Sequence, residues 1–142
     1  MSIWATVKFT PRNAYGEFVP GIVTPAVRAG VEGVCDFIKE RAQALAPLRT
    51  GRLRDSIFTK IDERLISIRG YVAPNVPYAA YVEFGTGIRG EMSAGAGGGP
   101  YSPTWPGMAA QPYMRPALDE AKDAMLGLIG DKLSAAIGSP YK

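Results

Sequence analysis

The side chains that most often carry acid–base and metal chemistry are nearly absent from this sequence. The 142 residues contain no histidine, which removes the commonest general base and zinc ligand and every Ser/His or Cys/His arrangement. Cys35 is the single cysteine, so an intramolecular disulfide and a cysteine-based metal site are both ruled out. We expect Cys35 to be a small buried hydrophobe in a protein that folds under reducing conditions, and we expect no metal and no cofactor.

The remaining chemical candidates are two pairs of carboxylates and one run of glycines. Asp62–Glu63 is typical of a turn and Asp119–Glu120 of a helix start, so neither predicts a catalytic pair. Gly95–Gly99 lacks the lysine and the Ser/Thr that complete a phosphate-binding loop, and we interpret it as a flexible tether. The sequence therefore favours a protein without enzymatic activity.

Three arginines, Arg49, Arg52 and Arg54, lie within six residues and make a local positive patch. Two interpretations stay open. In the first they pair with Asp55, Glu83 or another carboxylate, or are solvated. In the second they line a surface that faces DNA or an acidic protein, since phosphate contacts need no motif. The net charge of +3 and the pI of about 9.1 are compatible with either.

A long amphipathic helix is predicted to organise the chain between Thr24 and the turn that ends at Leu53. Thr24 is a suitable N-cap, Pro25 suits the first helical position, and Pro47 stops the helix. Its apolar stripe consists of Val27, Val31, Val34, Ile38, Ala42 and Leu45. At about 1.5 Å per residue the helix would span the domain, so the other elements should pack on or beside it.

Strand periodicity comes before and after this helix. Residues Ile3, Ala5, Val7 and Phe9 alternate with polar residues and with Trp4 in an N-terminal strand. This strand either closes its own sheet or reaches to a neighbouring subunit. Segments Ile57–Ile61 and Leu65–Ala73, joined by Asp62–Arg64, predict an antiparallel hairpin with a possible bulge at Gly70.

The second half begins with a short helix or turn, Tyr78–Thr86, that ends at Gly85 and serves either as core or as interface. Residues 85–112 then hold eight glycines and four prolines without periodicity. A second long helix starts at Pro116, and its apolar stripe consists of Leu118, Ala121, Met125, Ile129, Leu133 and Ala136. The candidate subunit or partner contacts are Trp4, Tyr78, Tyr81, Glu83, Phe84, Tyr101, Trp105 and Tyr113.

These segments predict one α+β domain, residues 1–142, in which two long amphipathic helices pack on a small antiparallel sheet. Its parts are the N-terminal strand and connection (1–23), the helix, hairpin and short helix (24–84), the Gly/Pro-rich loop (85–112) and the C-terminal helix (113–142). No signal peptide or membrane span is visible.

Three motifs in this order resemble the minor tail proteins of tailed phages, a family also described as tail-completion, neck or head–tail joining proteins. They are Ala46–Ile57, Tyr78–Thr86 and Ala110–Leu118, and the resemblance covers about residues 24–137. The matching positions are Pro47, Thr50, Gly51, Leu53, Ser56, Tyr78, Tyr81, Glu83, Phe84, Gly85, Thr86, Pro112 and Pro116. The strand before Thr24 and the Gly-rich insertion between Gly87 and Ala109 depart from the pattern.

The resemblance implies a structural, non-enzymatic protein of the virion, located at the head–tail junction and made in the bacterial cytoplasm. It implies a homo-oligomeric ring, expected to be six-fold, between the head connector or stopper and the tail tube or tail terminator. DNA would pass through the lumen without sequence-specific contacts. The alternative function is that of a small basic DNA-binding protein, which predicts salt-sensitive DNA affinity of the free subunit.

Overall fold

The computed structural model describes residues 5–9, 24–64, 67–90 and 105–137. In chain order the elements are β1 (Ala5–Phe9), α1 (Thr24–Leu45), α2 (Arg52–Asp55), β2 (Ile57–Arg64), β3 (Ser67–Pro74), α3 (Ala79–Phe84), the 3-10 turn η1 (Gly87–Arg89) and α4 (Met114–Ile137). The predictions for Ile3, Trp4, Tyr101 and the Gly95–Gly99 tether lie outside the described residues.

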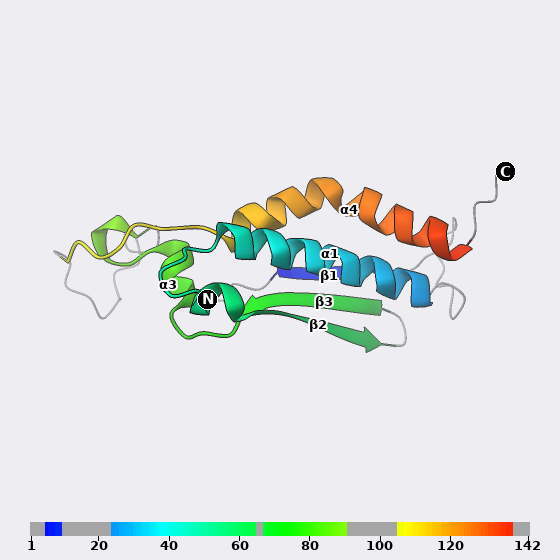
Figure 1. The fold of residues 1–142 in the computed structure, drawn as a ribbon, viewed down its shortest axis with the longest axis horizontal. Helices are drawn as coiled ribbons and strands as arrows, with labels where there is room; N and C mark the ends of the chain where they lie inside the picture. The colour runs from blue at the N-terminus through cyan, green and yellow to red at the C-terminus, as the bar shows by residue number, and fades with distance from the viewer. Residues whose placement is uncertain (1–4, 10–23, 65–66, 91–104, 138–142) are drawn as a thin grey trace.

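The described elements form layers, with α1 between the sheet and α4 (Figure 1). The three strands are antiparallel in the order β1-β3-β2, so the N-terminal strand joins its own subunit's sheet at the edge of β3. The predicted α+β class is confirmed. The second long helix packs mainly on α1 and not on the sheet, which makes α1 the element that the other layers share.

Helix α1 supplies more core residues than any other described element because it is covered on two sides. Val27, Val31, Val34, Ile38 and Ala42 are all buried, as the periodicity predicted. Cys35 is also buried, which confirms its role as a small core residue.

The prediction for Leu45, the last residue of this apolar stripe, is wrong because its side chain is exposed to solvent. The chain leaves the helix there, and Ala46 is buried instead, with its N–H donating to the Ala42 carbonyl at 2.9 Å.

Gly70, at the centre of β3, marks a close approach and not a bulge. Its pairing with Val7 on one side and Ile61 on the other is regular. A Cβ at this position would collide with Cys35 Sγ and lie 2.9 Å from Val31 Cγ1. Glycine therefore lets α1 lie directly on the middle of the sheet.

The charged triplet predicted to be the hairpin turn belongs to strand β2, which continues to Arg64. Arg64 Nε donates to Asp62 Oδ2 at 3.0 Å, and Arg28 on α1 reaches Glu63 Oε2 at 3.1 Å. An edge strand has solvent on its open side, so charged residues are tolerated there. Residues 65–66, where the strands connect, are outside the described part.

Helix α4 begins at Met114, two residues before the predicted start at Pro116. Asp119 and Glu120 therefore lie beyond its first turn, and the predicted stabilisation of the helix start by these carboxylates is wrong. Ala121 is buried, and Leu118, Met125 and Ile129 are partly buried against the core. The side chains of Leu133 and Ala136 fall outside the description. Among the described helices, none combines the length and apolarity that a membrane span needs.

Candidate functional site

An open groove lies at the end of the molecule where α1 stops. Pro47 ends the helix, and Gly51, with φ of 73°, turns the chain into the single turn of α2. Leu53 on α2 is buried and fixes this turn to the core. Tyr78, which directly precedes α3, Tyr81 on α3 and the chain segment before α4 complete the walls.

The groove has a volume of about 990 Å³ and a mostly apolar lining. Its lining residues are Pro47, Arg49, Thr50, Arg52, Leu53, Tyr78, Tyr81, Val82, Met108 and Gln111. Two of these side chains are cationic and none is a carboxylate, so the groove combines apolar surface with positive charge. This composition suits a protein or peptide side chain with acidic neighbours.

The far wall belongs to the Gly/Pro-rich loop predicted at residues 85–112. Its described parts, residues 85–90 and 105–112, are joined by backbone hydrogen bonds. Thr86 and Met108 exchange hydrogen bonds of 2.8 and 3.0 Å in an isolated β-bridge. The Gln111 N–H donates to the Val82 carbonyl at 2.8 Å. At Gly85, with φ of 72°, a Cβ would lie 2.5 Å from the Met108 carbonyl oxygen, so this approach needs glycine.

Glu83 of α3 caps the first turn of α4 from a different element. Its Oε2 accepts hydrogen bonds from the Tyr113 and Met114 N–H groups at 2.8 and 2.9 Å. Its Oε1 accepts from the Arg115 N–H and from Arg115 Nε, both at 3.1 Å. The carboxylate is 0% exposed, yet four donors satisfy it, and it satisfies N–H groups that a helix start leaves without partners. Glu83 therefore connects α3, the groove wall and α4.

Two side chains complete this junction. The Arg115 guanidinium lies 5.0 Å from the centre of the Phe84 ring. Tyr113 is fully buried, and its hydroxyl lies 3.5 Å from the Ala79 carbonyl oxygen. Burial, followed by the nearby charge of Glu83, raises the pKa of Tyr113, so the phenol stays neutral at physiological pH.

The structure separates the three predicted arginines. Arg49 and Arg52 line the groove, and neither has an ion pair with any described residue. Arg54 is outside the groove, and its Nε donates to Asp55 Oδ1 at 2.8 Å. The expected ion pair with Asp55 is thus present for Arg54. Glu83 pairs with Arg115 and with none of the three predicted arginines.

The predicted contact residues also divide. Tyr78 and Tyr81 line the groove, and Phe84 lies under Arg115. Glu83 and Tyr113 are enclosed by their own subunit, which leaves no surface of either for a partner to contact. Sequence reasoning missed the capping role of Glu83, although a carboxylate among the apolar residues of α3 was a signal that it is buried and bonded.

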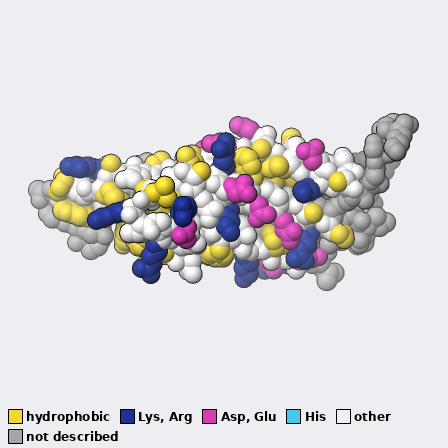
Figure 2. Space-filling model, viewed as in Figure 1, with side chains coloured by type: hydrophobic (Ala, Val, Ile, Leu, Met, Phe, Trp, Pro, Cys, Tyr) yellow, Lys and Arg dark blue, Asp and Glu magenta, His cyan; other side chains and the backbone are white. Residues whose placement is uncertain are grey.

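Apolar side chains are exposed at the groove end and also at other places on the face shown in Figure 2, but the large ones lie mostly around the groove. Of the seven large ones in the described residues, five belong to the segments around the groove: Leu45, Leu48, Tyr81, Ile88 and Trp105. The other two are Phe58 on β2 and Leu126 on α4. An apolar surface of this extent on one end is typical of a protein–protein contact.

The described residues offer little for catalysis. No group of three or more His, Cys, Asp or Glu side chains among them is arranged to hold a metal ion. Burial raises the pKa of the Cys35 thiol to about 11, so the thiol is protonated and poorly nucleophilic at neutral pH.

A family model described as "Bacteriophage HK97-gp10, putative tail-component" matches residues 10–85, which is more than half of the chain. The match includes α1, α2, the hairpin and α3, and thus most of the groove lining. The third sequence motif, around the start of α4, lies outside it. No curated protein and no solved structure matches the chain.

Proposed function

The chain belongs to the HK97-gp10-like family of bacteriophage tail components, and from this premise we propose that it joins the phage head to the tail. Membership of the family gives the protein a structural role in the virion. In the proposed arrangement, copies of the chain form a ring that contacts the head connector or stopper on one face and the tail tube or terminator on the other. The proposal includes no catalytic step.

The observation that carries this proposal is the apolar, arginine-bearing groove end. A single subunit leaves Leu48, Ile88 and Tyr81 largely in water, although such side chains gain about 1.5–3 kcal/mol each when they are fully buried. Tyrosine, tryptophan, methionine and arginine are the residue types enriched at protein contacts, and all four occur at this end. Head-to-tail contacts between identical copies close into a ring when the rotation between neighbours closes.

Light scattering and sedimentation of the purified protein over a range of concentrations test the proposal. We expect an oligomer that, for a six-fold ring, has about six times the 15.2 kDa mass of the chain. We also expect the protein to bind isolated tails or DNA-filled heads, and to restore joining in extracts that lack it. A single subunit that neither self-associates nor binds these particles would refute the proposal.

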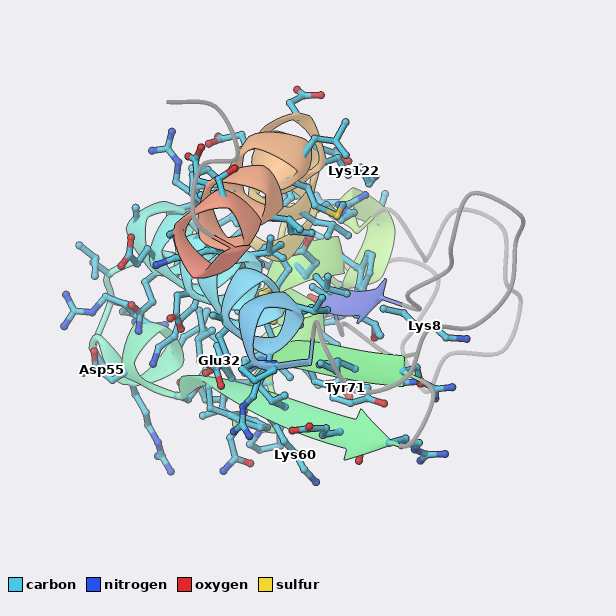
Figure 3. The ribbon with its side chains drawn as sticks, turned by 90° about the vertical axis from the view of Figure 1, so that its right-hand side faces the viewer. Lys8, Glu32, Asp55, Lys60, Tyr71 and Lys122 are labelled. Carbon is cyan, nitrogen blue, oxygen red and sulfur yellow. The ribbon has the colours of Figure 1, made fainter. Side chains whose placement is uncertain are left out.

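A second candidate, direct contact with DNA, is favoured by the outer face of the sheet, the face turned away from α1. The strand register places Lys8, Lys60, Arg64 and Arg69 on this face, with Asp62 as its only described carboxylate. The charges of these five side chains add up to +3, which equals the net charge of the whole chain. Figure 3 shows Lys8 and Lys60 on the sheet side, away from Lys122 on α4. No described helix covers this face.

The two functions differ in whether the free subunit or the assembled ring binds duplex DNA tightly, and the salt dependence of binding shows which lysines contact phosphates. If the face lines a DNA channel, the free subunit binds duplex DNA weakly, and the assembled ring binds more tightly because many faces contact one duplex. Replacing Lys8 and Lys60 by Gln should lower the salt slope by about 1 for each phosphate that a lysine no longer neutralises. Lys132→Gln on α4 is the control. Tight DNA binding by a protein that stays a single subunit would favour the DNA-binding function and refute the ring.

A further inference from the structure

Leu126 on α4 is the most exposed large apolar side chain in the described residues, at 87%. It lies on the face of α4 opposite the buried Ala117 and Ala121, which contact the core. Water surrounds nearly the whole side chain, so nothing within the described subunit explains a leucine at this position.

Carboxylates flank this leucine. Asp119, Lys122, Asp123 and Leu126 are exposed and share one face of the helix by their spacing, which gives the face a net charge of −1. Asp119 accepts a hydrogen bond from Lys122 at 2.8 Å, whereas Asp123 has no ion pair with a described residue. The face therefore presents one projecting apolar side chain beside negative charge.

The groove is the complementary surface. It is open and apolar, it contains Arg49 and Arg52, and it has no carboxylate in its lining. The groove lies at the end of the molecule near α3, whereas α4 runs along the top of α1 toward the other end (Figure 1). The two surfaces belong to different parts of one subunit, so they meet only between copies.

We propose that the Leu126 face of α4 on one copy docks in the Arg49/Arg52 groove of the next. This inference rests on the proposed ring and names the contact that builds it. Leu126 enters the apolar groove, and Asp119 and Asp123 approach the two arginines at its rim. Each copy then has one donor surface, the α4 face, and one acceptor surface, the groove.

Such a contact is heterologous, because a surface on one copy meets a different surface on the next. It therefore continues from copy to copy until a ring closes. A two-fold dimer would instead need the α4 face and the groove to lie together in one patch that pairs with itself, whereas the groove lies at the α3 end of the subunit (Figure 1).

The test uses two variants that each damage one surface. Leu126→Gln removes the apolar projection and keeps a good helix former. Arg49→Glu with Arg52→Glu reverses the charge of the groove. Since all three side chains are exposed, the variants should keep the far-UV circular dichroism of the wild type, and they should unfold at the thermal midpoint that the wild type has when diluted to single subunits. Phe58→Gln on β2 and Lys132→Glu on α4, both exposed and outside the two docking surfaces, are the controls.

Each surface variant should weaken self-association at least tenfold and sediment as a single subunit where the wild type is assembled. An equimolar mixture of the two variants should form a 1:1 complex and no larger species, because the Leu126→Gln protein keeps its groove and the groove variant keeps its α4 face. The controls should assemble as the wild type does.

Three outcomes overturn the inference. If Leu126→Gln assembles as the wild type does, or if the mixture remains single subunits, the contact is elsewhere, while the ring itself still stands. If the wild type is a single subunit at every concentration and does not bind tails, both the contact and the proposed function are refuted.

Discussion

Replacing Glu83 should lower the free energy of unfolding, and the number and burial of its hydrogen bonds determine by how much. The carboxylate is fully buried and accepts four hydrogen bonds from Tyr113, Met114 and Arg115. Buried donors that lose a partner cost about 1–3 kcal/mol each. Three of these donors are backbone N–H groups at the start of α4, which cannot move away without unwinding the helix start.

Glu83→Gln keeps the shape of the side chain but turns one oxygen into an amide nitrogen. The cheaper orientation points this nitrogen at Arg115, whose side chain is about half exposed and can bond to water. The amide oxygen then still accepts from Tyr113 and Met114. We expect a loss of about 2 kcal/mol in the free energy of unfolding, or about 6–8 °C in the melting temperature.

Glu83→Ala removes all four acceptor interactions and leaves the Tyr113 and Met114 N–H groups without partners in a buried place. The expected loss is about 4 kcal/mol, near the 3–5 kcal/mol seen when one member of a buried charged network is removed. Amide hydrogen exchange of these two residues should become faster than that of the middle of α1.

Urea unfolding followed by far-UV circular dichroism, at one protein concentration, measures both losses. Glu120→Gln is the control, since its carboxylate bonds to Arg41 at 2.7 Å on the exposed side of α4. Such a surface pair contributes about 0–1 kcal/mol. If Glu83→Gln is as stable as Glu120→Gln, the cap does not hold α4 and our account of the junction is wrong.

Two further predictions concern the contact between α1 and the sheet. Gly70→Ala should lower the free energy of unfolding by about 1–3 kcal/mol, because the added Cβ meets Cys35 Sγ and Val31 Cγ1. The control Gly33→Ala should be neutral or stabilising, because its Cβ meets only the end of Lys132 at 3.8 Å. Equal melting temperatures of the two variants would contradict the close approach of α1 to the sheet. The Cys35 thiol, with its pKa raised from 9.0 to about 11 by burial, should resist alkylation at pH 8 until the protein unfolds. Because the thiol loses its proton at lower pH in the unfolded state than in the folded state, the contribution of Cys35 to stability should be constant below pH 9 and fall by up to about 1.4 kcal/mol per pH unit between pH 9 and 11. Cys35→Ala should reduce that slope, and an unchanged slope would exclude Cys35 as its cause.

The parts of the fold that follow from local patterns were predictable. Helix α1 and its buried residues follow from the 3.6-residue period of Val27, Val31, Val34 and Ile38, and the structure bears this out. The strands follow from alternation, although their ends do not. Asp62–Arg64 has the composition of a turn, and only the ion pair between Glu63 and Arg28, far apart in sequence, shows why it can extend an edge strand.

The junction around Glu83 depends on contacts that no local pattern contains. Glu83 and the start of α4 are about 30 residues apart, and the segment between them was predicted to be a Gly/Pro-rich loop. The groove is similar, since it combines residues from the end of α1, from α3 and from the segment after η1. Its arginines and tyrosines were identified from the sequence, but their arrangement around a shared apolar surface required the fold.

In the order β1-β3-β2, β1 and β2 each have one edge that pairs with no other described strand, and this affects how the protein behaves at high concentration. Bare edges invite strand-to-strand aggregation when many copies are present together. Along the edge strand β2, Lys60, Asp62, Glu63 and Arg64 place charge of both signs beside the unpaired backbone. Pairing of another strand with this edge would require desolvation of these charged groups. The charged edge thus discourages amyloid-like growth and keeps subunits available for specific docking.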